Sequence, residues 1–152
     1  ELRRQRGLCA QGSAAMSRLV IDASVAAKWF FPEEHSAAAM RLLSPRNTLL
    51  APDLIWAEVA NIAWKRHRRK EITLDEARAI VADLVRMPLE IVRSSDLLPA
   101  AFDLAAATGR TVYDSLYLAL AIARRAKFVT ADERLVNALA GTGLEKRVRL
   151  VG

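Results

Sequence analysis

Four acidic residues lie at points of the chain where a fold can bring them to one place. They are Asp22 in LVIDAS, Glu58 in APDLIWAEVANIAWK, Asp114 in TVYDSLYLALA and Asp132 in KFVTADERL. Each follows a short apolar, strand-like run or lies near the start of a helix-like run. Carboxylates held close together raise one another's pKa. A hard cation with oxygen ligands, such as Mg²⁺ or Mn²⁺, is the usual partner for such a cluster.

Each acid also has a simpler interpretation as an ordinary structural residue. Asp22, or Ser24 after it, is a suitable cap for the helix that follows. Glu58 lies on the apolar stripe of its helix, where a glutamate is rarely buried without a partner. It could instead reach solvent from the edge of that stripe.

Capping patterns surround the other two acids. Thr111 precedes Asp114 by three residues, which is typical of a helix start. Thr130 and Glu133 have the same spacing around Asp132, so a capping box is expected there. No single acid therefore establishes a metal site; only the ordered set indicates one.

The strands and helices expected from the pattern would bring these acids together. Short apolar runs alternate with helical periodicity, which indicates parallel strands and a three-layer α/β domain. In such sheets ligands bind at the carboxyl ends of the strands. Strands are expected at 19–21, 48–51, 89–92, 127–129 and 148–151, and helices at 25–31, 34–43, 54–67, 72–85, 97–108, 112–125 and 133–139.

The composition sets limits on the class of protein. The chain has 152 residues, of which 53% are hydrophobic, enough for one domain with a sizeable core. Its single cysteine, Cys9, excludes an internal disulfide and fits a reducing compartment. The formal net charge of +6 permits an anionic partner without establishing one. Apolar runs are interrupted by charge before they reach the length of a membrane span.

The first fifteen residues, ELRRQRGLCAQGSAA, show neither strand nor helix periodicity, and Met16 follows as a plausible start. We interpret residues 1–15 as a leader or as a segment added ahead of the natural start, with a basic arm as the alternative. They lack the apolar centre of a secretory signal. Residues 16–152 are expected to form the single domain.

The chain from Met16 to Gly152 resembles the PIN-domain superfamily, and within it the VapC toxins of VapBC toxin–antitoxin pairs. The matching segments are LVIDASVAAKWF, LLAPDLIWAEVANIAWK, TVYDSLYLALAIA and FVTADERL, which occur in the family's order and approximate spacing. The resemblance implies an α/β/α PIN-like domain with a central parallel sheet of four to five strands.

The resemblance also implies a function and a set of site residues. It implies a cytoplasmic endoribonuclease that depends on Mg²⁺ or Mn²⁺, with Asp22 and Asp114 as direct metal ligands. Glu58 and Asp132 would bind the metal through water or orient the nucleophile. Two supporting residues match as well: Ser24, a polar residue that helps to hold the site, and Thr130, the small hydroxyl residue before the last acid.

The partners expected from the resemblance are an RNA substrate, a VapB-like antitoxin and a second copy of the chain. The antitoxin's C-terminal segment would dock near the acids, operator DNA would be bound only through the antitoxin, and no membrane is expected. The homodimer is expected to form through the helices at 54–86.

Three alternatives remain open from the sequence. The first is a PIN nuclease that processes RNA without an antitoxin, and the second is a binding-only PIN domain acting as an antitoxin partner or corepressor. The third is a receiver-like signalling domain, which is disfavoured because Asp22 stands without a second acid beside it. A phosphatase of the Asp-x-Asp type is disfavoured because position 24 is serine.

Basic and aromatic residues near the acids have two interpretations each. The run Lys65–Lys70 is either a solvated helix C-terminus, where cations are favoured, or a contact for RNA phosphates. Lys28 is a candidate partner for a site acid or a phosphate. Trp56 and Trp64 flank the helix of Glu58 and could belong to the core or to a groove for the antitoxin.

Overall fold

The computed structural model describes residues 16–152, so the expectation for residues 1–15 lies outside the described part of the chain. Five parallel strands form one sheet in the order β3-β2-β1-β4-β5. The strands are β1 Ser17–Ile21, β2 Asn47–Pro52, β3 Leu89–Val92, β4 Lys127–Thr130 and β5 Val148–Leu150. The expected parallel sheet with helices on both faces is therefore present.

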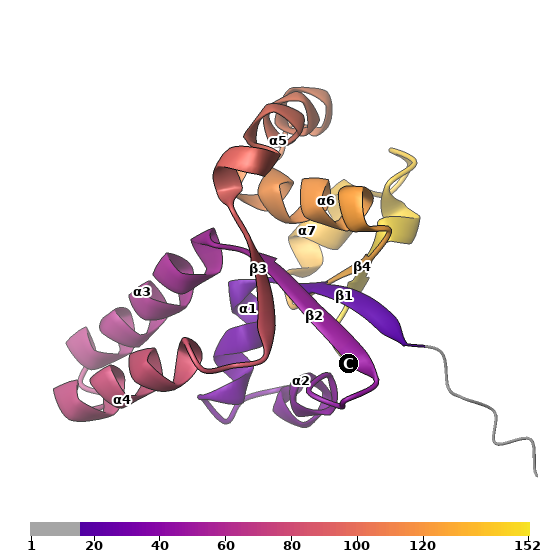
Figure 1. Ribbon diagram of the computed structural model, residues 1–152. Coiled ribbons are helices and arrows are strands. Elements are labelled where there is room, and N and C mark those ends of the chain that lie inside the picture. Colours follow the sequence, from indigo (N-terminus) through magenta and orange to yellow (C-terminus); the bar gives the residue numbers. More distant parts are fainter. Residues whose placement is uncertain (1–15) are drawn as a thin grey trace, which may run out of the picture.

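Helices cover the two faces of this sheet, and α3 and α4 extend from it as an antiparallel pair (Figure 1). The helical segments are α1 Ala23–Ala26, η1 Ala27–Trp29, α2 Ser36–Arg41, α3 Leu54–Arg68, α4 Leu74–Leu84, α5 Ser94–Thr108, α6 Val112–Arg124, α7 Glu133–Ala138 and η2 Glu145–Arg147. None of the helices within residues 16–152 combines the length and the apolar character that crossing a membrane requires.

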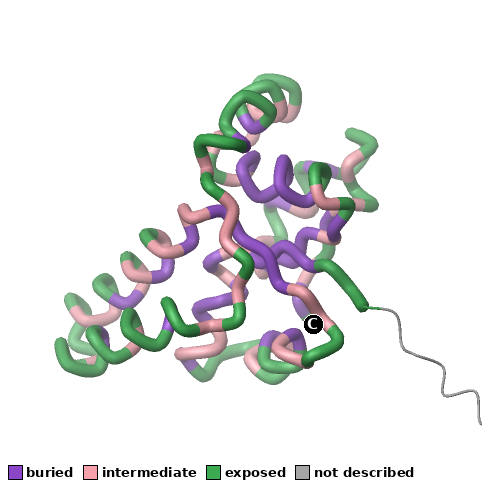
Figure 2. Tube along the Cα trace, in the orientation of Figure 1, coloured by how far each residue is buried: buried purple, intermediate pink, exposed green. Residues whose placement is uncertain are grey.

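Alternating side chains of the strands form a core on each side of the sheet. Val20 and Phe128 pack with α5, α6 and α7 on one face. Leu19 and Ile21 pack with α1, α2 and α3 on the other face. Burial is concentrated in the central strands β2, β1 and β4 and in α6, whereas the outer turns of α4 and α5 are mostly exposed (Figure 2). The sheet edge that carries the acids is thus held by two packed layers.

The order of the strands creates a switch point between β1 and β4. The chain moves outward through β2 and β3 on one side of β1 and then continues with β4 and β5 on the other side. Connections leave β1 and β4 in opposite directions, which opens a crevice at their carboxyl ends. Asp22 follows β1 directly, and Asp132 lies two residues after β4.

Several expected helix boundaries were wrong. The segment expected as one helix at 25–31 is a short α-helix followed by a 3₁₀ turn. The helix expected at 34–43 begins only at Ser36, because His35 has left-handed backbone geometry with φ 64°. The helix expected at 97–108 begins three residues earlier, at Ser94. Proline at position 99 is the sixth residue of this helix, where it removes the hydrogen bond that a backbone N–H would donate to the carbonyl of Ser95.

Helix α6 is more deeply buried than an amphipathic stripe predicts. Every residue from Ser115 to Ala121 is buried, so the helix is enclosed on all sides at that point. This central helix carries Asp114 in its first turn, and its burial fixes the direction in which that turn faces.

Candidate active site

The four acids predicted from the sequence line one cleft. Asp22, Glu58, Asp114 and Asp132, together with Ser24, border a hollow of about 340 Å³. Asp22 and Asp132 come from the carboxyl ends of β1 and β4, Glu58 from the second turn of α3, and Asp114 from the first turn of α6. Segments separated by as many as 110 residues thus converge at the switch point of the sheet.

Asp22 lies at the floor of the cleft, where hydroxyl groups hold both of its carboxylate oxygens. Ser24 Oγ donates to Oδ1 at 2.5 Å, and Thr130 Oγ1 donates to Oδ2 at 2.5 Å. The backbone N–H of Val25 donates to Oδ1 at 3.2 Å, so Asp22 also caps α1. The capping role and a role in the cleft therefore coexist in one side chain.

Burial raises the pKa of the Asp22 carboxyl to about 6, and the charge of Glu58 adds to this effect. The hydrogen bonds from Ser24, Thr130 and Val25 oppose the shift without cancelling it. The ionised form of Asp22 is therefore under-stabilised in the protein alone. A cation in the cleft would remove this deficit.

Glu58 has the partner that its position on an apolar stripe required. The Tyr117 hydroxyl donates to Glu58 Oε1 at 2.6 Å. Burial raises the pKa of Glu58, the Tyr117 hydrogen bond opposes the rise, and the charge of Asp114 increases it. Burial and the charge of Glu58 raise the pKa of Tyr117, so this phenol stays protonated and acts as a donor.

Tyr117 is a cleft residue that sequence reasoning missed. It is 3% exposed and stacks on Phe128, with ring centroids 5.6 Å apart. In the sequence it is one member of an apolar run. The signal that could have found it is its position three residues after Asp114, one turn along the same helix.

Asp114 faces the cleft but forms an ion pair at its edge. Arg110 Nη2 lies 3.1 Å from Asp114 Oδ2, and Thr111 Oγ1 accepts the backbone N–H of Asp114 at 3.1 Å. The expected cap at Thr111 is therefore confirmed. Arg110 Nε is buried with no hydrogen-bond partner among the described residues.

Asp132, rather than Thr130, caps α7, so the expected capping box of Thr130 with Glu133 was wrong. Asp132 Oδ1 accepts the backbone N–H groups of Arg134 at 3.0 Å and Leu135 at 3.2 Å. Thr130 is fully buried and instead joins Asp22 to the backbone of Asp132, whose N–H it accepts at 3.1 Å. One hydroxyl thus links the two acids at the ends of β1 and β4.

The oxygen ligands of the cleft suit a hard cation, although the carboxylates do not lie close enough together to hold one in their present positions. Every acidic group in the cleft offers oxygen, and burial, with a smaller effect from a neighbouring acid, raises the pKa of Asp22 and of Glu58. Within residues 16–152, no three histidine, cysteine or acidic side chains converge closely enough to hold a metal ion as they stand. The ion pair with Arg110 holds Asp114 at the edge of the cleft and so contributes to the separation of the carboxylates.

Lys28 does not contact a cleft acid, contrary to one expectation. Its ammonium lies 3.3 Å from Glu33 Oε1 and 2.8 Å from the carbonyl oxygen of Glu34. The basic residue that borders the hollow is instead Lys65, together with Asn61 and Ile62. Positive charge at the cleft therefore comes from Lys65 on α3 and, at the edge, from Arg110 beside Asp114.

Comparison with known proteins identifies the fold that carries this cleft. The family model for the PIN domain matches residues 19–139, which include all four acids. The chain belongs to the PIN domain family. Ribonuclease VapC3 of Pyrobaculum aerophilum is 39% identical over 122 residues, covering 79% of this chain and 93% of that protein. This PIN domain is accordingly a homologue of the VapC ribonucleases.

Solved structures share the architecture of this PIN domain at lower sequence identity. Mycobacterium tuberculosis VapC20, a toxin that cleaves the sarcin–ricin loop, superposes with a TM-score of 0.61 at 16% identity, covering 79% of this chain and 94% of that chain. VapBC2 of Rickettsia felis, bound to a DNA fragment from its promoter, gives 0.60 at 15% identity, covering 89% and 99%. At such identities the likeness concerns the fold.

Proposed function

We propose that this PIN domain is an endoribonuclease that depends on Mg²⁺ or Mn²⁺ and acts as the toxin of a VapBC toxin–antitoxin pair in the cytoplasm. The observation that carries the proposal is the convergence of Asp22, Glu58, Asp114 and Asp132 on one cleft at the switch point of the sheet. The 39% identity to a VapC ribonuclease over most of both chains supports the same activity.

Asp22 and Asp114 are the proposed direct metal ligands, and Glu58 and Asp132 the proposed ligands through water. When bound, the metal would polarise a phosphate oxygen and lower the pKa of a water molecule. Ser24 and Thr130 hold Asp22 from two sides, which fixes the direction of its carboxylate. Tyr117 does the same for Glu58. Fixed oxygens of this kind position an attacking water without reorganisation during the reaction.

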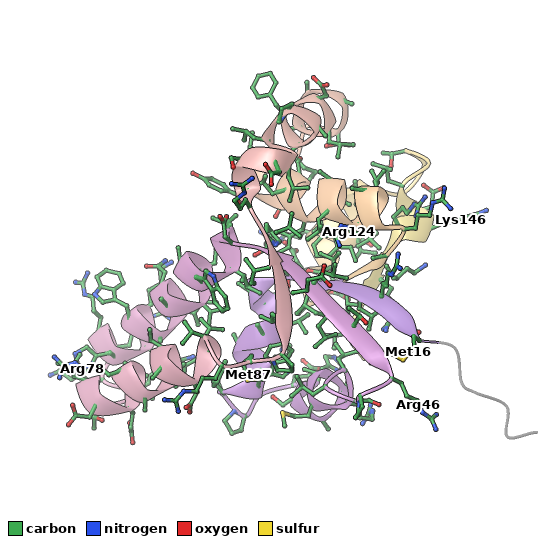
Figure 3. The ribbon with its side chains drawn as sticks, viewed as in Figure 1. Met16, Arg46, Arg78, Met87, Arg124 and Lys146 are labelled. Carbon is green, nitrogen blue, oxygen red and sulfur yellow. The ribbon has the colours of Figure 1, made fainter. Side chains whose placement is uncertain are left out.

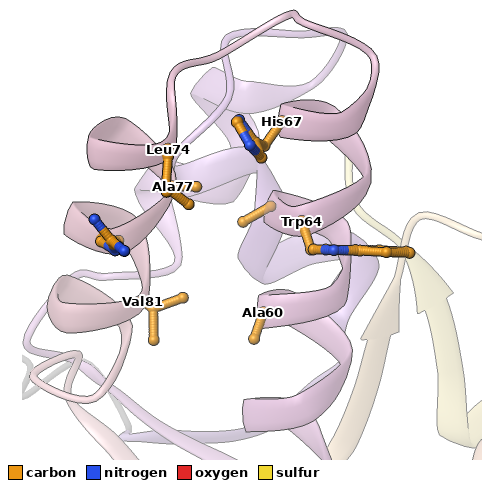
Figure 4. A pocket seen from close by; sticks show the side chains of 8 residues that line it. Ala60, Trp64, His67, Leu74, Ala77 and Val81 are labelled. Carbon is orange, nitrogen blue, oxygen red and sulfur yellow. The ribbon is translucent and has the colours of Figure 1, made fainter.

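The antitoxin and the second copy of the chain are proposed as partners on separate surfaces. The proposed antitoxin segment docks beside the acids and thereby excludes RNA from the cleft. Helices α3 and α4 form the proposed dimer surface, where Leu74, Val81 and Val85 are exposed. An apolar groove of about 250 Å³ lies between these helices and is bordered by Ala60, Leu74 and Val81 among others (Figure 4). Exposed apolar surface of this kind is typical of protein interfaces.

Cleavage of total RNA by the purified full chain tests the proposed activity. The protein is first freed of any bound antitoxin by denaturation and refolding, then assayed with Mg²⁺ or Mn²⁺ beside Asp22→Asn. We expect discrete fragments that disappear with chelator and in the Asp22→Asn variant. Intact RNA with stripped wild-type protein would overturn the ribonuclease proposal and favour the binding-only alternative.

A further inference from the structure

The run of basic residues at the end of α3 separates into two groups with different surroundings. Arg66 is engaged inside the fold: its guanidinium contacts Glu33 at 3.0 Å and Glu71 at 3.4 Å and lies over the Phe31 ring. His67 Nδ1 lies 3.2 Å from the carbonyl oxygen of Ile72. These two residues stabilise the turn between α3 and α4.

Lys65, Arg68 and Arg69 form the second group, and no acidic partner lies within ion-pair distance of them in residues 16–152. All three are exposed. Together with Trp64 they border a hollow of about 310 Å³. The dipole of α3 favours cations in its last turn. It does not explain why these three line a hollow while Arg66 does not.

The hollow and the acidic cleft share Lys65, which borders both. Glu58, Asn61, Lys65 and Arg68 follow one another at intervals of three or four residues, so they lie on one face of α3. At 1.5 Å per residue, Glu58 and Arg68 are about 15 Å apart along the helix axis. A polar and then basic strip therefore runs from the cleft toward the end of α3.

An exposed aromatic ring accompanies this strip. Trp64 is 50% exposed, and the Arg68 guanidinium lies 5.1 Å from the centre of its ring. Trp64 also borders the groove between α3 and α4, and its indole extends from α3 on the side away from α4 (Figure 4). Half of a large apolar ring is thus available to solvent beside three free cations. Base stacking on aromatic rings, flanked by phosphate contacts from Lys and Arg, is how proteins hold unpaired nucleic acid.

We propose that this strip of Lys65, Arg68, Arg69 and Trp64 is the binding track for the single-stranded flank of the RNA that enters the acidic cleft. The proposal rests on the proposed ribonuclease function and adds the class of substrate that the site takes. Lys65 contacts the phosphate nearest to the scissile bond, Arg68 and Arg69 contact phosphates farther along, and Trp64 stacks on an unpaired base. Duplex RNA offers no unstacked base to this ring and binds the strip less well.

Binding of a labelled RNA to the full chain tests the track separately from cleavage. The Asp22→Asn background prevents turnover, and the probe is a fluorescein-labelled single-stranded RNA of about 15 nucleotides with mixed sequence. The test variant replaces Lys65, Arg68 and Arg69 with glutamine. The matched control replaces Arg41, Arg46 and Arg86 with glutamine, which removes the same charge. These residues precede β2 and β3, at the opposite edge of the sheet from the acids (Figure 3, Arg46).

We expect the track variant to bind the probe roughly 10-fold more weakly at about 0.1 M salt, and its salt exponent to fall by about 2, since each single-strand phosphate contact contributes about 0.7. The control should keep the wild-type exponent. Trp64→Phe should retain most of the affinity, whereas Trp64→Leu should lose several-fold, because only an aromatic ring stacks. A duplex of the same sequence should be affected less than the single strand by all of these changes.

The outcomes distinguish this proposal from the ribonuclease proposal. If wild-type protein cleaves RNA but the track variant binds and cleaves like the control, the track is wrong and the ribonuclease proposal stands. Equal losses for single strand and duplex would overturn the claim for unpaired RNA. If the track variant binds RNA normally but no longer forms a complex with the antitoxin, the strip is a protein-binding surface, and the track is also overturned.

Discussion

The hydroxyl of Tyr117 donates to Glu58 Oε1 at 2.6 Å, so one phenol on α6 holds the acid on α3. The Tyr117 ring is in turn held by its stack on Phe128 of β4. This arrangement fixes the position of the Glu58 carboxylate relative to the strand ends that carry Asp22 and Asp132. Tyr117 is therefore a positioning residue in the proposed reaction.

Replacing Tyr117 with phenylalanine should slow RNA cleavage about 10-fold and raise the Mn²⁺ concentration that gives half-maximal activity. The ring keeps its stack on Phe128, so the loss is confined to the hydroxyl and costs about 1 kcal/mol of stability. Steady-state cleavage at several Mn²⁺ concentrations measures both effects. Tyr113→Phe, an exposed tyrosine on the same helix, is the control and should behave as wild type. Wild-type cleavage by Tyr117→Phe would remove the positioning role.

The pKa of Asp22 predicts how stability depends on pH without metal. The folded-state pKa is raised from 3.8 to about 6, so the native state holds this proton more tightly than the unfolded state does. The stabilisation is therefore fully present below about pH 4 and is lost as pH rises through 6, by at most about 1.4 kcal/mol per pH unit. Urea unfolding of wild type and Asp22→Asn between these values measures it.

Asparagine at position 22 cannot ionise, so its stability relative to wild type should rise from pH 4 to 6 and then remain constant. Asp103→Asn, at an exposed acid of α5, removes the same charge and is the control. Adding Mg²⁺ at neutral pH should stabilise wild type and leave Asp22→Asn unchanged, since a bound cation favours the ionised carboxylate. If the difference in unfolding free energy between wild type and Asp22→Asn does not vary with pH, the pKa of Asp22 is not raised by burial, and the prediction is wrong.

The parallel sheet and the meeting of the four acids at one end of it could be predicted from the sequence, because both follow from local patterns. Short apolar runs that each end in a polar residue specify strands and their carboxyl ends, and Asp22 and Asp132 lie at two of those ends. The Tyr117–Glu58 bond was not predictable in the same way, because it joins residues 59 positions apart and depends on how α3 and α6 pack. The cap of α7 was misassigned to Thr130, since tertiary contact with Asp22 determines where that hydroxyl donates.

Thr130→Val should test whether the hydrogen bonds of one hydroxyl hold Asp22 and Asp132 in place at the strand ends. Valine has nearly the same shape, but Asp22 Oδ2 loses a donor and the Asp132 N–H loses an acceptor. We expect a loss of about 1–3 kcal/mol in unfolding free energy, because buried polar groups are left unpaired, and a drop in cleavage greater than that of Ser24→Ala. Circular dichroism melts and cleavage assays measure the two effects. A neutral Thr130→Val would show that solvent in the cleft replaces the hydroxyl.

If Asp114 binds a cation as proposed, Arg110 competes with that cation, and removing Arg110 should strengthen metal binding. Its guanidinium lies 3.1 Å from Asp114 Oδ2, which turns one of the proposed ligands toward the edge of the cleft. In Arg110→Gln the carboxylate is free to face the other acids, and we expect calorimetry to give a Kd for Mn²⁺ lower by about 3- to 10-fold. The cost to stability should be small, about 1 kcal/mol or less, because partly exposed ion pairs contribute little. Arg93→Gln, which removes an exposed ion pair with Asp96, controls for the loss of charge. Weaker Mn²⁺ binding in Arg110→Gln than in Arg93→Gln would mean the reverse, that Arg110 orients Asp114 for the metal instead of withholding it.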